Sequence, residues 1–317
     1  MSLKDQIKKN DFIYFSLKKS LFFLKYTVPN AAFREKYAEY VIKKRFRQTF
    51  GREINLESPT TLNEKLQWLK LNIHEDFHTQ CADKYKARDV WRKYGEDGLI
   101  PLLFKTYDYR DITIESIPDE PCIIKANTGC GSYHIIRDKS DINIKSIQRE
   151  CRSWLVGNYY YVSQEWQYKN IKPCILIEKL LLDANGKIPN DYKFNFINGE
   201  LQFIYCSVDR EGQNYRSIYG PDWKRLNIEW VGKNNHKGTL VGADIQPPHN
   251  LDRMIEIGKD IAKRFCYVRV DFYEVDKRLY YGEITLHHGS GFDTFEPEEY
   301  DYIYGEKLKL PVNKGNH

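Results

Sequence analysis

The chain has 317 residues, of which 41% are hydrophobic and 29% charged, and its formal net charge is +5 at pH 7. This composition provides for a sizeable core, and the length corresponds to two domains or one multi-lobed domain at about 150 residues per domain. No stretch approaches the ~18 uninterrupted apolar residues of a membrane span, and the small net charge gives no reason to expect a nucleic-acid partner.

The first 58 residues are predicted to form a basic helical extension. Apolar residues recur at helical spacing in "REKYAEYVIKKRF", and residues 1–52 carry thirteen Lys and Arg against four Asp and Glu. Such a basic, aromatic-rich segment suits peripheral contact of residues 1–50 with an anionic membrane surface. It also suits a solvated helix whose aromatic side chains pack on the rest of the protein, which is the interpretation that we favour.

Two further helices are predicted next. In "SPTTLNEKLQWLK", Thr60 or Thr61 is expected to cap a helix, with Glu64 in the first turn and an apolar side that follows. The segment "CADKYKARDVWRKYG" predicts a second, continuous helix over residues 81–95, which Gly95 ends.

After residue 95 the apolar residues no longer recur at helical spacing. "LIPLLFKTY" (99–107) and "PCIIKAN" (121–127) are short apolar runs bounded by Asp, Pro and Gly, which predicts strands. "KSIQRECRSWLVGNYY" (145–160) returns to helical spacing. We therefore expect residues 59–175 to form a first mixed lobe.

Strands dominate the predicted second lobe, residues 176–317. The expected strands are "PCILIEKLLLD", "DYKFNFING", "ELQFIYCSV", "YVRVDFYEV" and "RLYYGEITL", with one helix, "LDRMIEIGKDIAKRF", among them. The dipeptide Asn198-Gly199 predicts a tight hairpin, and "VDKR" at 275–278 predicts a second one. The order of elements indicates an α+β fold with an antiparallel sheet in the C-terminal lobe.

The stretch "CIIKANTGCGS" places Lys125 at the end of an apolar strand, followed by Gly129, Gly131 and Ser132. Bare backbone N–H groups beside an ammonium group can hold phosphate oxygens. A hairpin turn with a lysine that reaches solvent explains the same residues. The stretch alone leaves both interpretations open.

A second group of charged residues lies in "RVDFYEVDKRLYYGEIT". Arg269 and Asp271 share one face of their strand, Tyr281 and Glu283 are expected to share a face of the next, and the hairpin brings Asp271 near Glu283. Converging carboxylates suit Mg²⁺, which prefers oxygen ligands. A ladder of salt bridges between Arg269 and the two carboxylates is the alternative.

Taken together, these pieces resemble the ATP-grasp superfamily from about residue 60 to about residue 305. In "ADKYKAR", Lys84 matches the lysine that contacts the α-phosphate in that superfamily. Lys125 matches its strand lysine, and Gly129, Gly131 and Ser132 match its flexible phosphate-covering loop. The resemblance implies two α/β lobes that clamp ATP.

The segment "ILIEKLL" resembles the hinge between the lobes of that superfamily. By this match Glu178 would accept a hydrogen bond from the adenine amino group, and Lys179 and Leu180 would offer backbone groups to the ring. Asp191 stands where an acidic residue binds the ribose hydroxyls, and Lys193 follows it at strand spacing and is expected to face the cleft or the surface.

The pattern "RVD…GEIT…G" is similar to the R-x-D…E-x-N…G pattern of the D-alanine ligase branch. The match implies that Asp271 and Glu283 hold Mg²⁺, that Arg269 stabilises charge at the reacting carbonyl and that Gly289 lends an N–H group to it. The sequence departs from the pattern at Thr285, where the branch has Asn, and this puts a second Mg²⁺ in doubt.

Several stretches resemble a narrower group, the teichuronopeptide-type (TupA-like) ATP-grasp proteins of bacterial polysaccharide gene clusters. These stretches are "LNEKLQWLKL", "DYKFNFINGE", "YGPDWKRL" and "HHGSGFDTFEPEEYD". The group implies an ATP- and Mg²⁺-dependent ligase that joins an amine or amino acid to a uronic acid of a polymeric, lipid-linked or nucleotide-linked glycan. His287 or His288 could then deprotonate the amine, or both could be structural.

Two alternatives to the ligase remain open. A polysaccharide glycosyltransferase would need a D-x-D-type metal motif, which "DFYEVD" matches poorly, and a catalytically degenerate scaffold is suggested only by Thr285. The seven cysteines are scattered, odd in number and free of any C-x-x-C, which argues against disulfides and zinc. We expect a cytoplasmic protein, with the inner face of the membrane as its place if residues 1–50 bind lipid.

Overall fold

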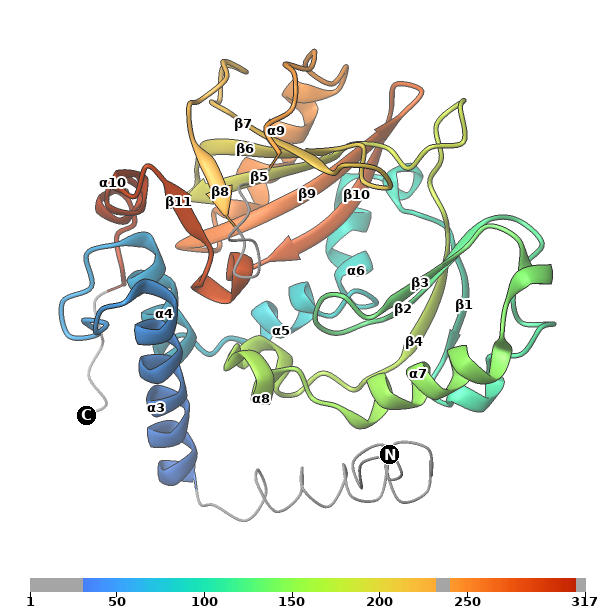
Figure 1. Cartoon of the computed structure of the whole chain (residues 1–317), viewed down its shortest axis with the longest axis horizontal. Coiled ribbons are helices and arrows are strands. Elements are labelled where there is room, and N and C mark those ends of the chain that lie inside the picture. Colours follow the sequence, from blue (N-terminus) through green and yellow to red (C-terminus); the bar gives the residue numbers. More distant parts are fainter. Residues whose placement is uncertain (1–30, 232–239, 312–317) are drawn as a thin grey trace.

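The computed structural model describes residues 31–231 and 240–311, so most of the predicted basic leader lies outside the described residues. Two antiparallel sheets organise the chain (Figure 1). The smaller sheet has the order β1-β4-β2-β3, and the larger has the order β10-β9-β5-β6-β7. The predicted α+β architecture, with an antiparallel sheet in the C-terminal half, is therefore confirmed.

The smaller sheet forms the first lobe with one amphipathic helix. Its strands are β1 (Leu102–Thr106), β2 (Cys122–Ala126), β3 (Tyr133–Ile136) and β4 (Ile175–Lys179). Helix α7 (Ile144–Val156) buries Ile147 and Cys151 against Ile124 and Ile177 of the sheet. The short helix α8 (Tyr160–Ser163) and the 3₁₀ helix η5 (Trp166–Tyr168) lead from α7 to β4.

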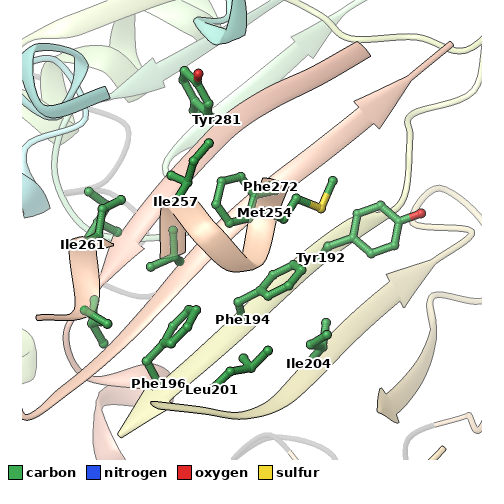
Figure 2. Packing of buried hydrophobic residues seen from close by; sticks show 14 of the residues in the cluster. Tyr192, Phe194, Phe196, Leu201, Ile204, Met254, Ile257, Ile261, Phe272 and Tyr281 are labelled. Atoms are coloured by element: carbon green, nitrogen blue, oxygen red, sulfur yellow. The ribbon is translucent and has the colours of Figure 1, made fainter. Parts of the chain in front are cut away.

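The larger sheet carries the main hydrophobic core on one face. Its strands are β5 (Asp191–Ile197), β6 (Glu200–Val208), β7 (Tyr215–Tyr219), β9 (Tyr267–Val275) and β10 (Arg278–Thr285). Helix α9 (Leu251–Ala262) packs Met254 and Ile257 onto Phe194 and Phe272, as Figure 2 shows. A side chain at Gly258 would collide with the Phe196 ring at 2.4 Å, so glycine lets the helix approach the sheet.

Helices α5 (Asp76–Ala82) and α6 (Ala87–Trp91) also belong to this core, beside β10. Trp91 stacks on Tyr281 with ring centroids 4.9 Å apart. The continuous helix predicted over 81–95 is therefore wrong, because α5 ends at Asp83, whose carboxylate accepts the N–H groups of Tyr85 and Lys86 in a turn. Gly95 ends the last turn as predicted, with a φ of 124°.

The other face of the larger sheet packs on a second group of elements. These are α4 (Leu62–Asn72), α10 (Glu299–Lys307), β8 (Glu229–Val231) and β11 (Thr294–Glu296). Thr61 and Glu64 form the predicted capping box at the start of α4. Trp230 and Phe203 belong to the hydrophobic core between these elements and the sheet.

Helix α3 (Ala31–Phe50) packs on the body of the protein. Its Ile42 and Phe46 are buried with Ile54 and Phe292, as the favoured packing interpretation expects for this part of the extension. In the described ranges 31–231 and 240–311, no helix is long and apolar enough to cross a membrane.

The sheets divide the chain differently from the predicted boundaries. Strand β4 pairs within the smaller sheet, so the sheet changes after Lys179 and not at residue 175, and helices α4 to α6 pack with the larger sheet. The remaining short 3₁₀ segments are η1 (Arg92–Tyr94), η2 (Glu96–Gly98), η3 (Tyr109–Asp111), η4 (Lys139–Asp141) and η6 (His288–Gly291). Strands β3, β7, β8 and β11 and helix α10 had no prediction.

Candidate active site

A cavity of about 360 Å³ lies between the two sheets. Its wall includes many of the predicted nucleotide-binding residues, namely Lys84, Lys125, Gly129, Gly131, Ser132, Glu178, Lys179 and Leu180, together with Glu283. The volume falls within the range of about 300–1,000 Å³ that is usual for ligand sites. The fold therefore gathers residues from both sheets, far apart in sequence, around one space.

The glycine-rich stretch forms a hairpin that also walls this cavity. Strands β2 and β3 pair up to Lys125 and Tyr133, and Ala126 donates its N–H to the Ser132 carbonyl at 3.0 Å. Gly129 has a φ of +68°, and a Cβ there would lie 2.5 Å from the Tyr159 ring. The hairpin and the cavity wall are thus the same segment, so the two sequence interpretations do not exclude each other.

Asn127 fixes the base of this hairpin, a role that no sequence pattern indicates. Its side-chain NH₂ donates to Asp83 at 2.9 Å and to the Lys172 carbonyl at 3.1 Å, while its Oδ1 accepts from the Cys174 N–H at 2.8 Å. Asp83 directly precedes Lys84, whose N–H donates to the Asn127 carbonyl at 2.9 Å. One buried amide therefore joins the turn that carries Lys84 to the hairpin and to β4.

The two predicted phosphate-binding lysines are paired with protein oxygens. Lys84 donates to the Gly129 carbonyl at 2.5 Å and lies 3.4 Å from Glu283, and Lys125 lies 2.6 Å from Glu178. Arg88 approaches the same buried Glu178 carboxylate at 3.7 Å. Glu178 thus shares its single negative charge between two cations in this arrangement.

The predicted hinge residues already use their N–H groups. The Lys179 N–H donates to the Pro101 carbonyl and the Leu180 N–H to the Pro121 carbonyl, both at 3.0 Å. The Lys179 ammonium lies 2.9 Å from Glu120. These two N–H groups are therefore not available to hydrogen-bond an adenine ring at the hinge unless the backbone moves.

The larger sheet contributes a row of charged residues on β5 and β9. Lys193 pairs across the strands with Asp271, lies 3.3 Å from its carboxylate and is also bonded to Asp191. Within the described chain no donor reaches the buried Oδ1 of Asp191, so this oxygen is available to accept a hydrogen bond from a hydroxyl group. Arg210, 3.9 Å from Asp191, lines the cavity wall while Asp191 itself lies behind it.

Arg269 and Asp271 form a two-pronged ion pair, with both N···O distances at 2.7 Å. Although burial opposes the charge, Asp271 raises the pKa of Arg269. The salt-bridge alternative is therefore partly realised, within one strand and not across the hairpin. The ion pair and a metal site do not exclude each other, because the Asp271 carboxylate can exchange one partner for the other.

A bulge in β10 sets the direction of Glu283. The register shifts between Tyr281 and Ile284, so Gly282 and Glu283 together lie opposite Asp271. A Cβ at Gly282 would lie 2.7 Å from the Asp271 carbonyl. The prediction that Tyr281 and Glu283 share a face is wrong, because the extra residue leaves Tyr281 on the core face of β10, opposite Phe272, and turns Glu283 to the face of Asp271.

Glu283 is the more available of the two predicted metal ligands. Its side chain is 41% exposed. Burial opposes its ionisation, but the cations Lys84 and Lys125 lower the pKa of its carboxyl to about 2. It therefore stays ionised at all ordinary pH values.

The donor set fits a magnesium ion that keeps phosphate and water ligands. No group of three or more His, Cys, Asp or Glu gathers for a metal anywhere in the described residues. Mg²⁺ is usually held by one or two carboxylates plus substrate phosphates, which Asp271 and Glu283 can provide. Thr285 lies opposite Arg269 in the register of β9 and β10.

Gly289 lies in the tight turn η6, where it has a φ of 50° and Ser290 a φ of 58°. Gln67 of α4 donates to the Ser290 and Gly291 carbonyls at 3.1 and 2.6 Å. The buried ammonium of Lys70 donates to the Ser290 carbonyl at 2.5 Å. Contacts from a helix about 220 residues earlier therefore hold this turn, and sequence reasoning missed them.

The histidines beside Gly289 have structural environments. His287 is 7% exposed and contacts Gln167 and Glu165, and His288 is fully buried and bonded to the Tyr267 hydroxyl. Burial lowers the pKa of both imidazoles. The structural interpretation of the two histidines is therefore the better one.

The two sheets and the cation-lined cavity between them are those of an ATP-grasp fold. A family model described as TupA-like ATPgrasp matches residues 64–309, and the chain belongs to this family. The sequence resemblance is thereby confirmed. No curated protein matches the chain.

Solved structures give distant similarities. The D-alanine–D-alanine ligase from Bacillus anthracis is 17% identical, with 76% of this chain and 66% of that chain covered and a TM-score of 0.39. The L-amino acid ligase from Bacillus licheniformis is 15% identical, with 86% and 62% covered and a TM-score of 0.43. An ADP complex of the N5-carboxyaminoimidazole ribonucleotide synthetase PurK is 12% identical, with 70% and 50% covered and a TM-score of 0.38. The chain spans half to about two thirds of these proteins.

Proposed function

We propose that the protein is an ATP-dependent carboxylate–amine ligase that forms an amide through an acyl phosphate. Its acid would be a uronic acid of a capsular or cell-wall polysaccharide, and its amine an amino acid or similar compound. The observation that carries this proposal is an ordered row of groups. From the cavity outward, β9 presents Tyr273, Asp271 and Arg269 on one face, and β10 presents Glu283 beside Asp271.

The cavity end of this row suits the nucleotide. Lys84 and Lys125 are compact cations at the wall, and phosphate oxygens would replace the Gly129 carbonyl and Glu178 as their partners. The hairpin that carries Gly129 stands over the same space and would exclude water from a reactive acyl phosphate.

The opposite end of the row suits the reacting carbonyl. Bound between Asp271 and Glu283, Mg²⁺ would supply charge neutralisation for the transferred phosphate. Asp271 would exchange its bonds to Arg269 and Lys193 for this role, which frees the Arg269 guanidinium for the oxyanion. A well-placed oxyanion donor is worth about 3 kcal/mol, and the Gly289 N–H would be the second donor.

The basic leader fits an acceptor at an anionic surface. Each basic residue near such a surface contributes about 1 kcal/mol, and salt weakens the attraction. Deleting residues 1–27, which ends before α3 begins, should spare turnover of a soluble uronate and lower activity on a lipid-linked acceptor, more so at low ionic strength. Equal activity of the truncated and full chains on the lipid-linked acceptor would contradict membrane docking.

The test is a screen for ADP and phosphate release with ATP, Mg²⁺, glucuronate or galacturonate, and glycine, glutamate or lysine. A ligase releases both products only when a carboxylate is present. A glycosyltransferase would instead release a nucleoside diphosphate from a sugar nucleotide without using ATP. ATP binding in calorimetry with no turnover across the screen would support the degenerate scaffold.

A further inference from the structure

The carboxylate of Asp293 lies directly against Gly289. A Cβ built on Gly289 would be 2.0–2.3 Å from the Asp293 carboxyl atoms, so the carboxylate occupies the space that any side chain at 289 would need. Asp293 follows Gly289 by only four residues, and the left-handed conformations of Gly289 and Ser290 fold it back. If Gly289 assists the reacting carbonyl, Asp293 stands beside that carbonyl as well.

One oxygen of this carboxylate is fixed and the other is available. The Trp230 indole N–H, from β8, donates to Oδ2 at 2.8 Å. The Trp230 ring is buried between Phe203, Phe295 and His288, so the donor is rigid. Among the described residues no hydrogen bond to Oδ1 is formed.

Arginine side chains surround the Asp293 carboxylate, but none of them forms an ion pair with it in the described chain. Burial raises the pKa of the Asp293 carboxyl, while the Trp230 bond and the guanidinium groups of Arg269, Arg216 and Arg45 act in the opposite direction. These arginines come from β9, β7 and α3, and in the described chain none lies within 4.0 Å of the carboxylate as an ion pair. Arg45 lies 4.1 Å over the Phe292 ring, and its buried Nε has no described hydrogen-bond partner.

We propose that Asp293 is the catalytic residue that binds the ammonium group of the incoming amine and accepts its proton. This inference rests on the proposed ligase function and deepens it. The ammonium transfers one proton to Oδ1, and the nitrogen lone pair forms the C–N bond to the acyl carbon. The bond between the acyl carbon and the bridging phosphate oxygen breaks, and inorganic phosphate leaves with the electron pair of that bond. The second proton on nitrogen and the proton on Asp293 then pass to solvent.

The arginines add a substrate preference to this assignment. Arg269 is paired with Asp271, but Arg45 and Arg216 form no ion pair within the described chain, and the buried Nε of Arg45 has no partner there. These two guanidinium groups favour amines that also carry an acidic group. Amino acids are such amines, since their ammonium group would meet Asp293 while their carboxylate meets an arginine.

The Asp293→Asn variant tests the base role, because the amide keeps the shape of the side chain and cannot take a proton. Wild type and variant are given ATP, Mg²⁺, the uronate that releases ADP with wild type, and either hydroxylamine or glutamate. Hydroxylamine is unprotonated at neutral pH and needs no base to trap an acyl phosphate. We expect hydroxamate formation to be retained and amide formation to fall by about 10²-fold or more.

A second readout separates a base from a structural support. Raising the pH toward the pKa of the amine should restore part of the amide formation in Asp293→Asn. If the variant makes amide at the wild-type rate, or loses hydroxamate and amide equally while it melts like wild type, the inference is overturned. The exposed Glu298 offers a matched control, and Glu298→Gln should leave both products unchanged.

Trp230→Phe keeps the test decisive if Asp293→Asn fails to fold. It removes the indole N–H that donates to the carboxylate and keeps a smaller aromatic ring in its place. It should lower amide formation more than hydroxamate formation, and an equal effect on both contradicts the proposal. If wild type releases no ADP with any uronate, the ligase function itself has failed, which is a different result from a base that proves dispensable.

Discussion

Replacing Lys70 by Met should cost both stability and turnover. The Lys70 side chain is 2% exposed. Its ammonium donates to Gln67 Oε1 at 3.0 Å, to the Ser163 carbonyl at 3.1 Å and to the carbonyl and hydroxyl oxygens of Ser290 at 2.5 and 2.9 Å. Met is unbranched like Lys and only one atom shorter, and it can donate nothing, so the substitution removes these bonds without opening a large cavity.

The size of the stability loss follows from the hydrogen bonds that remain once Lys70 is replaced. Ser290 keeps a bond from Gln67 at 3.1 Å, and Ser163 keeps one from the Ser290 hydroxyl at 3.3 Å, but in the described chain Gln67 Oε1 has no other donor. A buried acceptor without a donor costs about 1–3 kcal/mol. Glu165 also loses a nearby cation that helps to lower its carboxyl pKa against the effect of burial. We expect a total loss of about 3 kcal/mol.

Urea unfolding and steady-state kinetics measure the two effects. Lys65→Met on the same helix is the control, because Lys65 donates to the Gly305 and Leu308 carbonyls, away from the turn of Gly289. Lys70→Met should lower kcat while the KM for ATP is unchanged, and Lys65→Met should lower stability only. Adding Glu165→Gln to Lys70→Met should recover part of the stability. A Lys70→Met protein within about 0.5 kcal/mol of wild type would refute this reasoning.

The remaining predictions concern the nucleotide and metal sites. Lys84→Met and Lys125→Met should each weaken ATP binding in calorimetry by about tenfold, and Lys125→Met should also slow chemistry; unchanged affinity in both would place the nucleotide elsewhere. Asp271→Asn or Glu283→Gln should abolish turnover while the melting transition persists, and near-wild-type activity with Mg²⁺ would remove the metal assignment. Because the folded pKa of Glu283 is lowered to about 2, its stabilisation is present above its ordinary pKa of 4.5 and is lost as the pH falls toward 2, so Glu283→Gln should flatten the acid loss of stability over that window.

Local chemistry made much of the fold predictable. The capping box of Thr61 and Glu64 and the hairpin at Asn198-Gly199 depend on residues a few positions apart, and both appear where the sequence indicates them. The same holds for the strand that carries Lys125 and for the opposition of Asp271 and Glu283 across the last hairpin.

The errors arise where distant contacts override local pattern. The bulge at Gly282 and Glu283 depends on the close approach of Gly282 to the Asp271 backbone, which alternation along β10 does not reveal. The helix predicted over 81–95 is interrupted because Asp83 bonds to Asn127, 44 residues later. The hydrogen bond between Asp83 and Asn127 cannot be predicted from the local sequence of either segment.

The charged groups of the site carry a positive excess, and this excess bears on how the site works. The four carboxylates of Glu178, Asp191, Asp271 and Glu283 are in contact with six cations, namely Lys84, Lys125, Lys193, Arg269, Arg88 and Arg210. The negative charge of a bound nucleotide would compensate for this excess. Removing the carboxylate of Asp271 or Glu283 would enlarge the excess and should tighten nucleotide binding while it abolishes chemistry. Tight ATP binding by an inactive Asp271 or Glu283 variant would therefore agree with the proposed mechanism.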